Sequence, residues 1–154
     1  MLRLNRLTDY AIVAMSKMAH GKERVRTATQ ISLETGVPVP TIAKLLNVLV
    51  KGGLVVSHRG ATGGYTLSRP ALEITAADII QTIEGPIALT ACVEGSDEKC
   101  DIQSNCPMCG NWNKVNLAIR KALTEVTLAD LGTSACIATA VPPEVISQAA
   151  SSAN

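Results

Sequence analysis

The fold is decided by residues 38–67, PVPTIAKLLNVLVKGGLVVSHRGATGGYTL, near the middle of a chain of 154 residues. Pro40 suits the first turn of an α-helix, which we expect over residues 40–51. Gly52 then ends the helical pattern. Four apolar residues recur at helical spacing and predict one buried face, Ile42, Leu45, Leu46 and Leu49.

A β-hairpin is expected directly after this helix. Residues 54–59 predict a strand, residues 60–64 a glycine-rich turn, and residues 65–67 the returning strand. Gly63 and Gly64 permit close backbone approach and φ > 0. The glycines lack the Lys-Ser/Thr of a phosphate-binding P-loop, and a strand rather than a helix follows them.

Two helices are expected before this segment. Thr27 and Gln30 fit a capping box, which opens a helix that ends at Gly36. Thr8 is expected to be the N-cap of a first helix over residues 9–20. A short helix, a tight turn and a second helix make a helix-turn-helix, and the hairpin after it is the wing of a winged helix. The predicted fold class is mainly α with a small β-hairpin wing, a winged helix-turn-helix plus a long dimerisation helix.

The outer side chains of the helix at 40–51 suit a DNA groove. Lys can bind phosphate or guanine, and Asn and Thr can bind base edges. A solvated helix face would look similar, and that alternative stays open for the helix by itself. The wing favours DNA, because Arg59 at its base can enter a narrow, A·T-rich minor groove. The candidate DNA-binding residues are Thr41, Lys44, Asn47, Lys51, Arg59, Thr62, Gly63, Gly64 and Tyr65.

The net charge of +1 hides an asymmetry between two parts of the chain. Residues 1–69 hold ten Lys or Arg and three Asp or Glu, a net charge of +7. Residues 70–154 hold four and ten, a net charge of −6, so the two parts add to +1. The basic part favours a polyanion, here double-stranded DNA, as its partner.

A second motif is the cysteine run at residues 92–109, CVEGSDEKCDIQSNCPMC, with the spacing C-x7-C-x5-C-x2-C. Soft thiolate ligands select zinc or an iron–sulfur cluster, and spacing alone does not separate the two. A disulfide and scattered core cysteines are the alternatives. The charged N-terminus MLRLNRLTDYA does not fit a secretory signal, and charged residues flank the thiols. The candidate ligands are Cys92, Cys100, Cys106 and Cys109, whereas Cys136 is interpreted as a bystander.

The C-terminal part combines this loop with helices. Thr75 and Asp78 predict another cap, opening a helix that reaches Gly85. A longer helix is expected over residues 111–126, with a stripe of apolar residues at steps of 3 and 4, Trp112, Val115, Ile119, Ala122 and Val126. The stripe predicts a homodimer interface, with packing on the N-terminal helix as the alternative. The expected regions are a DNA-binding region at 1–70, a cluster-binding loop with a dimerisation helix at 71–132, and an Ala- and Ser-rich disordered tail at 133–154.

Composition argues against two other classes of protein. No apolar run reaches the ~18 residues that a membrane span needs, so a soluble, cytoplasmic protein without a membrane partner is expected. His20 and His58 are remote in sequence from the cysteines, and no acid pair or nucleophile motif occurs. Neither an enzyme nor a small-molecule substrate is therefore expected. A thiol-based cluster carrier without DNA binding is the alternative from another class.

Several stretches together carry a resemblance to a known family. They are LTDYA at 7–11, RGATGGYTL at 59–67, DII at 78–80 with IEG at 83–85, and the cysteine run with its following helix. With these, the chain resembles the Rrf-two family of winged-helix bacterial repressors over about residues 1–132. Cys100, Cys106 and the GNW at 110–112 are most similar to its iron–sulfur-sensing branch, which regulates cluster-assembly or iron genes.

The resemblance implies a homodimer on a pseudo-palindromic operator. It also implies an iron–sulfur cluster, 2Fe-2S or 4Fe-4S, that controls operator affinity. Its first three ligands would be Cys92, Cys100 and Cys106. The fourth would be Cys109, favoured because thiolate is the softer ligand for iron, or the partner's Asp9, or an exogenous ligand. Structural zinc in a four-cysteine site is the alternative cofactor.

Overall fold

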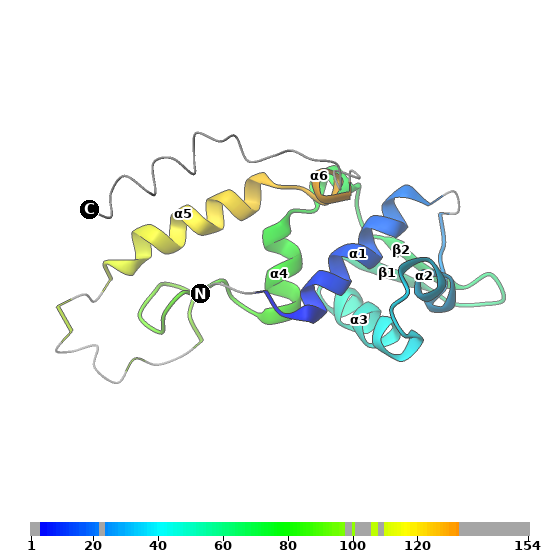
Figure 1. The fold of residues 1–154 in the computed structure, drawn as a ribbon, viewed down its shortest axis with the longest axis horizontal. Helices are drawn as coiled ribbons and strands as arrows, with labels where there is room; N and C mark the ends of the chain where they lie inside the picture. The colour runs from blue at the N-terminus through cyan, green and yellow to red at the C-terminus, as the bar shows by residue number, and fades with distance from the viewer. Residues whose placement is uncertain (1–3, 22–23, 98–99, 101–105, 108–109, 133–154) are drawn as a thin grey trace, which may run out of the picture.

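The fold is mainly α with one small hairpin, as predicted. The structure is a computed structural model that describes residues 4–21, 24–97, 100, 106–107 and 110–132. The tail predicted at 133–154 lies outside these residues. Helices α1 to α3 and the hairpin form one unit, and α5 lies on the far side of α4 from them (Figure 1). The elements are α1 (Arg6–His20), α2 (Ala28–Thr35), α3 (Val39–Lys51), β1 (Val55–His58), β2 (Gly64–Leu67), the 3-10 helix η1 (Ala71–Glu73), α4 (Ala76–Glu84), α5 (Trp112–Glu125) and α6 (Leu128–Gly132).

The apolar face of α3 forms the centre of the core. The four residues predicted for this face are all buried, Ile42, Leu45, Leu46 and Leu49. They belong to one cluster with Ala11, Ala14 and Met15 of α1, with Ile31 of α2 and with Leu128 of α6. The buried members of this cluster are aliphatic, and the rings of Tyr10 and Tyr65 pack at its edge.

Local signals set the ends of α2 as predicted. The Thr27 hydroxyl accepts a hydrogen bond from the Gln30 N–H at 3.2 Å, and the Gln30 side-chain oxygen accepts from the Thr27 N–H at 2.8 Å. At the other end Gly36 has a φ of 72°, and its N–H donates to the Ser32 carbonyl at 2.8 Å. The left-handed conformation ends the helix without the steric cost of a side chain.

The first helix begins earlier than predicted. Its N-cap is Asn5, whose side chain accepts from the Leu7 N–H, so the prediction of Thr8 as the cap was wrong. Thr8 is fully buried and donates its hydroxyl to Glu84 at the end of α4. The same carboxylate accepts from the Asn5 N–H at 2.8 Å, a favourable position for a negative charge at a helix N-terminus. Glu84 therefore joins the start of α1 to the end of α4.

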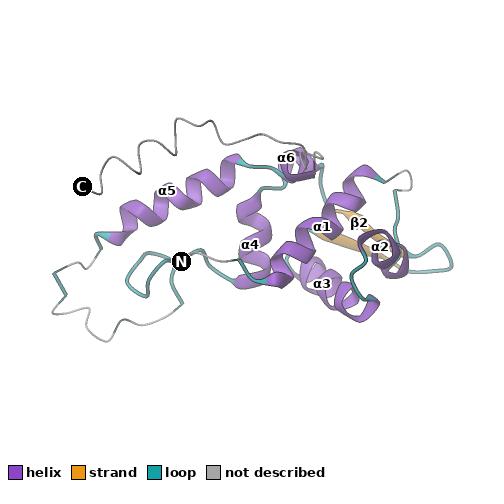
Figure 2. Ribbon diagram, viewed as in Figure 1, coloured by secondary structure: helices purple, strands orange, loops and turns teal. Residues whose placement is uncertain are grey.

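The wing, residues 55–67, is an antiparallel hairpin whose register pairs Val55 with Leu67 and His58 with Gly64. Within the described residues the sheet has these two strands (Figure 2). Arg59 follows β1 directly, so it lies at the turn of the wing, and the prediction that it lies at the base of the wing was wrong.

The wing glycines have two different roles. Gly60, with a φ of 115°, has the positive φ in the turn of the wing, whereas Gly63 and Gly64, which would permit one, do not adopt it. The predicted close approach is confirmed, because a Cβ on Gly63 would lie 2.7 Å from the His58 carbonyl oxygen. A Cβ on Gly64 would lie 2.7 Å from the Arg26 carbonyl oxygen. The two glycines are needed for space, and Gly60 for backbone conformation.

The capping box predicted for α4 is present. The Asp78 N–H donates to the Thr75 hydroxyl at 3.1 Å, and the Thr75 N–H donates to Asp78 Oδ2 at 3.0 Å. Arg69 Nη2 donates to the same oxygen at 2.8 Å. Burial alone would raise the pKa of the Asp78 carboxyl, but the hydrogen bonds from Thr75 and the Arg69 guanidinium outweigh burial and lower it.

The segment after α5 returns to the start of α4. Thr127 forms an antiparallel bridge with Thr75, and the Leu128 N–H donates to the Ile74 carbonyl at 2.7 Å beside it. Helix α6 then packs on α1 and η1. Helix α5 is one residue shorter at each end than the predicted 111–126.

No single helix in the described ranges is long and apolar enough to cross a membrane. Helices α2 and α3 meet the length and composition criterion only when taken together, across a bend of 119°. That bend is the turn of the helix-turn-helix, and the apolar face of α3 lies in the core.

Candidate nucleic-acid interface and cysteine loop

The outer face of α3 is turned to solvent. Lys44, Asn47 and Lys51 are exposed, and Thr41 at the start of the helix is half-buried. The helical period puts these residues opposite the apolar face, which α1 covers. The structure therefore brings the four α3 candidates together on one surface.

The wing adds one exposed cation, Arg59, to the two on α3. Arg59 and Thr62 are exposed, whereas Gly63, Gly64 and Tyr65 are half-buried. The ring of Tyr65 packs at the edge of the core. His58 Nε2 and the Thr66 hydroxyl form a hydrogen bond of 2.9 Å across the two strands, which ties the strands together. Arg59 and Thr62 are thus the wing candidates whose side chains reach outward.

A groove of about 520 Å³ separates the wing from the N-terminus of α2. Arg24 and Thr27 line one wall, and Thr62 and Gly63 line the other. Arg24 is an exposed cation that the sequence analysis missed, because nothing in the charged turn before α2 distinguishes one basic residue from the next.

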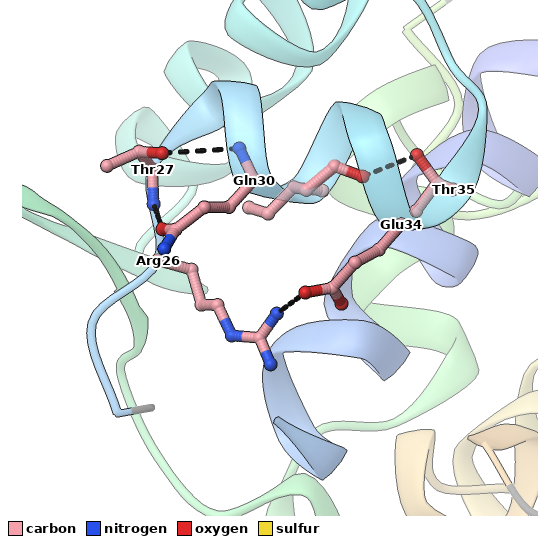
Figure 3. A network of polar contacts seen from close by, with 6 residues as sticks. Arg26, Thr27, Gln30, Glu34 and Thr35 are labelled. Carbon is pink, nitrogen blue, oxygen red and sulfur yellow. Dashed lines mark hydrogen bonds and ion pairs between the residues drawn. The ribbon is translucent and has the colours of Figure 1, made fainter. Parts of the chain in front are cut away.

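Arg26 joins the wing to α2 beside this groove. Its backbone N–H donates to the Tyr65 carbonyl at 2.9 Å, and its carbonyl accepts from the Tyr65 N–H at 2.8 Å. Its guanidinium forms an ion pair with Glu34 on the last turn of α2 (Figure 3). The sequence analysis did not identify this pair either.

The cysteine loop, residues 92–109, carries half-buried free thiols at Cys92, Cys100 and Cys106. Cys109 and Cys136 lie outside the described residues. The Thr90 hydroxyl lies 3.2 Å from Cys92 Sγ. In the described part of the chain, no three His, Cys, Asp or Glu side chains lie close enough to hold a metal ion. The donor chemistry fits zinc or an iron–sulfur cluster, but the described thiols do not converge.

Two asparagines of α5 hold the start of this loop and the segment that leads into it. Asn116 is only 2% exposed, its Nδ2 donates to the Ile87 carbonyl at 3.0 Å, and its Oδ1 accepts from the Leu89 N–H at 3.1 Å. Asn113 Oδ1 accepts from the Glu94 N–H at 2.9 Å. Asn at i and i+3 on a polar helix face has no distinctive pattern, so the sequence analysis missed both.

The apolar stripe of α5 is open to solvent in the single chain. Trp112 is 40% exposed, Val115 43% and Val126 37%; Ala122 is also exposed, and Ile119 is half-buried. The alternative prediction, packing of the stripe on the N-terminal helix, is therefore wrong for most of its length. Asp9, on the first turn of α1, is exposed as well.

Comparison with known proteins agrees with this fold. Residues 4–134 match the Rrf2 family, described as iron-dependent transcriptional regulator. Protein aau3 of Rhizobium meliloti (strain 1021) is 33% identical over 122 residues, which cover 79% of this chain and 75% of that protein. The structure of CymR (YrzC), the global cysteine regulator of B. subtilis, matches with a TM-score of 0.65 and 28% identity, covering 86% of this chain and 98% of CymR. T. potens IscR matches with a TM-score of 0.62 and 30% identity, covering 89% and 93%.

The winged helix with its exposed basic face defines a DNA-binding transcriptional regulator. The chain belongs to the Rrf2 family, which is the Rrf-two family that its sequence resembles. It is accordingly a regulator and not an enzyme. Because one similar structure is a cysteine regulator, family membership by itself does not assign the signal.

We expect Asn116→Ala to loosen the segment that leads into the cysteine loop. The substitution leaves the half-buried Leu89 N–H and Ile87 carbonyl without their partner, at a cost of about 1–3 kcal/mol. Urea unfolding should report that loss, and amide exchange at residues 87–94 should accelerate. The matched control is Asn113→Ala, which removes one hydrogen bond in an exposed position and should cost less than about 1 kcal/mol. Equal effects of the two substitutions would contradict this assignment.

Proposed function

We propose that this chain is a homodimeric repressor whose operator affinity is controlled by an iron–sulfur cluster on the cysteine loop. Its targets would be genes of iron–sulfur cluster assembly or iron homeostasis. The observation that carries the proposal is the four-thiol motif, on a loop tied to α5, in a family described as iron-dependent. We expect the protein in the cytoplasm, with DNA and a second copy of the chain as partners, and without a membrane or a small-molecule substrate.

The proposed operator contacts come from α3 and the wing. With α3 in the major groove, Lys44 and Lys51 can bind guanine or phosphate and Asn47 can bind adenine, with Thr41 nearby. With the wing at the adjacent minor groove, Arg59 can enter it. Thr62 and the backbone at Gly63 and Gly64 lie close to the phosphates in that arrangement, and Tyr65 supports the wing from the core side. The exposure of the α3 and wing cations supports this mode.

The proposed cluster ligands are Cys92, Cys100 and Cys106, with Cys109 or the partner's Asp9 as the fourth. When bound, an iron–sulfur cluster supplies a soft, redox-sensitive centre that responds to oxidants and to iron supply. The Thr90 hydroxyl, 3.2 Å from Cys92 Sγ, is in position to donate to this sulfur as a thiolate.

A series of hydrogen bonds supports a connection between the cysteine loop and the DNA-binding helices. Asn116 of α5 binds the backbone of Ile87 and Leu89. Shortly before them in the chain, Glu84 binds Asn5 and Thr8 of α1. Helix α1 packs against α2 and α3. Half-sites of an operator lie ~34 Å apart, so a small rotation of the two α3 helices changes affinity.

The proposed dimer is supported by the open stripe of α5. One copy of the chain leaves four of its five members exposed. Monomeric proteins rarely expose contiguous apolar surface of this kind, and a second copy of the same stripe would cover it. Such a dimer would also supply the two α3 helices that a pseudo-palindromic operator requires.

Operator binding tests the DNA-contacting mode. We expect Lys44→Ala and Arg59→Ala each to weaken operator binding about tenfold or more, the loss typical of a specific contact. Each phosphate contact removed should also lower the slope of log affinity against log salt by about 1. The measurement is a fluorescence-anisotropy titration at several salt concentrations. The control is Lys121→Ala, which removes the same charge from α5, where Lys121 pairs with Glu125. Wild-type affinity in both variants would exclude the proposed contacts.

Sedimentation tests the dimer interface. We expect the wild-type chain to sediment at twice its mass of 16.1 kDa. Val115→Glu puts a charge within the apolar stripe and should produce monomers, because burying an unpaired carboxylate is costly. Leu117→Glu is the matched control, since Leu117 is exposed on the same helix but outside the stripe. A monomeric wild type, or two variants that behave alike, would rule out this interface.

Colour and metal content test the cofactor. We expect anaerobically purified wild type to be brown and to contain iron and sulfide, because Cys thiolates hold such a centre and the chain belongs to a family described as iron-dependent. The triple variant Cys92→Ser, Cys100→Ser and Cys106→Ser should be colourless, and Cys136→Ser should keep the colour. Iron per chain in Cys109→Ser and Asp9→Ala then identifies the fourth ligand. A colourless wild type with one zinc per chain would instead support structural zinc.

A further inference from the structure

Arg26 lies in the basic part of the chain, residues 1–69, but its guanidinium is buried. Its side chain is 9% exposed, and its Nη1 donates to the Glu34 carboxylate. Its Nε is buried and has no hydrogen-bond partner among the described residues. A guanidinium in this position is not available to a DNA phosphate, in contrast to the exposed Arg24 and Arg59.

The surroundings of Arg26 are shaped to hold it. Gly64 brings β2 so close that a Cβ there would lie 2.7 Å from the Arg26 carbonyl oxygen. A side chain at Gly21, directly after α1, would have to displace the guanidinium. The paired backbone hydrogen bonds with Tyr65 hold the wing, and the ion pair with Glu34 holds α2. Figure 3 shows Arg26 reaching from the start of α2 to Glu34 at its other end.

We propose that Arg26 is a positioning residue for DNA binding, which fixes the wing relative to α3 without touching DNA. The backbone of Arg26 holds β2, and its side chain holds α2, which packs directly on α3. The residue thereby sets the distance from Arg59 on the wing to Lys44 on α3, the two cations that must reach adjacent grooves together. This inference rests on the proposed DNA-contacting mode.

The mechanism follows from the ion pair. Glu34 is 40% exposed on its side chain and Arg26 is nearly buried, so the pair lies at the edge of the core. Without the guanidinium, Glu34 loses its partner and the segment at residue 26 loses its side-chain contact with α2. The wing then keeps its own strand pairing, since the β1–β2 register does not involve Arg26. It loses its fixed orientation relative to α2 and α3.

The first test is amide exchange in the free protein. Arg26→Met keeps the apolar stem and removes the charge. We expect exchange of the Tyr65 N–H, which is bonded to the Arg26 carbonyl, to accelerate about tenfold, while the amides paired between β1 and β2 and those of α3 and α4 stay protected. Uniform acceleration across the chain would mean a general loss of stability, and an unchanged wing would mean no positioning role; either result overturns the proposal. Arg69→Met, which breaks the Asp78 ion pair, is the matched control and should leave the wing unchanged.

The second test measures coupling on the operator. We expect Arg59→Ala to weaken binding about tenfold in the wild type and less than about twofold in Arg26→Met, because the wing is then already misplaced. Lys44→Ala should cost the same in both backgrounds, and Arg69→Met should preserve the full effect of Arg59→Ala. An Arg59→Ala effect of equal size in the wild type and in Arg26→Met overturns the proposal.

Two further variants, Glu34→Gln and Arg26→Lys, extend the operator-binding test. If Arg26→Met does not fold, Glu34→Gln removes the charge of the acceptor and should reduce the Arg59→Ala effect in the same direction. Arg26→Lys keeps a cation and should restore part of that effect. If Arg59→Ala has no effect in the wild type, the wing contact of the proposed function fails, and the exchange measurement alone decides whether Arg26 holds the wing.

Discussion

The architecture depends on the burial of one face of α3 against α1. Ile42, Leu46 and Leu49 are fully buried, and each such side chain contributes about 1.5–3 kcal/mol. Together they approach the whole stability of a small domain, about 5–15 kcal/mol. Because the helical period relates the two faces, burying this one determines where Lys44 and Asn47 point. The same packing therefore sets both the stability of the winged helix and the direction of its basic surface.

Contacts within a few residues could be predicted from the sequence, and distant ones could not. The capping boxes at Thr27 and Thr75 were identified because both partners of each box lie three positions apart. The predicted cap at Thr8 failed because Glu84, 76 positions away, accepts its hydroxyl. Gly64 was correctly expected to allow close approach, but the group that approaches it, the Arg26 carbonyl, belongs to another part of the chain. Helix ends and turns were accordingly more predictable than what packs on them.

The residues of the candidate site also fall into two groups, those that a local pattern predicted and those held by distant contacts. The outer face of α3 followed from helical periodicity, and the cysteine loop from the spacing of its thiols. The contacts of Asn116 span 27 and 29 positions, and a polar side chain that becomes buried has no local signature. The described thiols do not converge by themselves, since the described part of the loop is largely polar and Val93 is its one buried apolar side chain. In the proposed function the metal supplies that missing cohesion, which couples binding to folding of the loop.

The backbone bridge between Thr75 and Thr127 has a mechanical consequence. It anchors the end of α5 against the start of α4, while the Trp112 end of the helix lies beside the cysteine loop. With 14 residues, α5 is about 21 Å long. If the bridge stays fixed, a displacement of about 2 Å at the outer end of α5 corresponds to a tilt of only about 5° at this length. A displacement of the Trp112 end of α5 would therefore reach the winged helix as a small change in the angle of the helix.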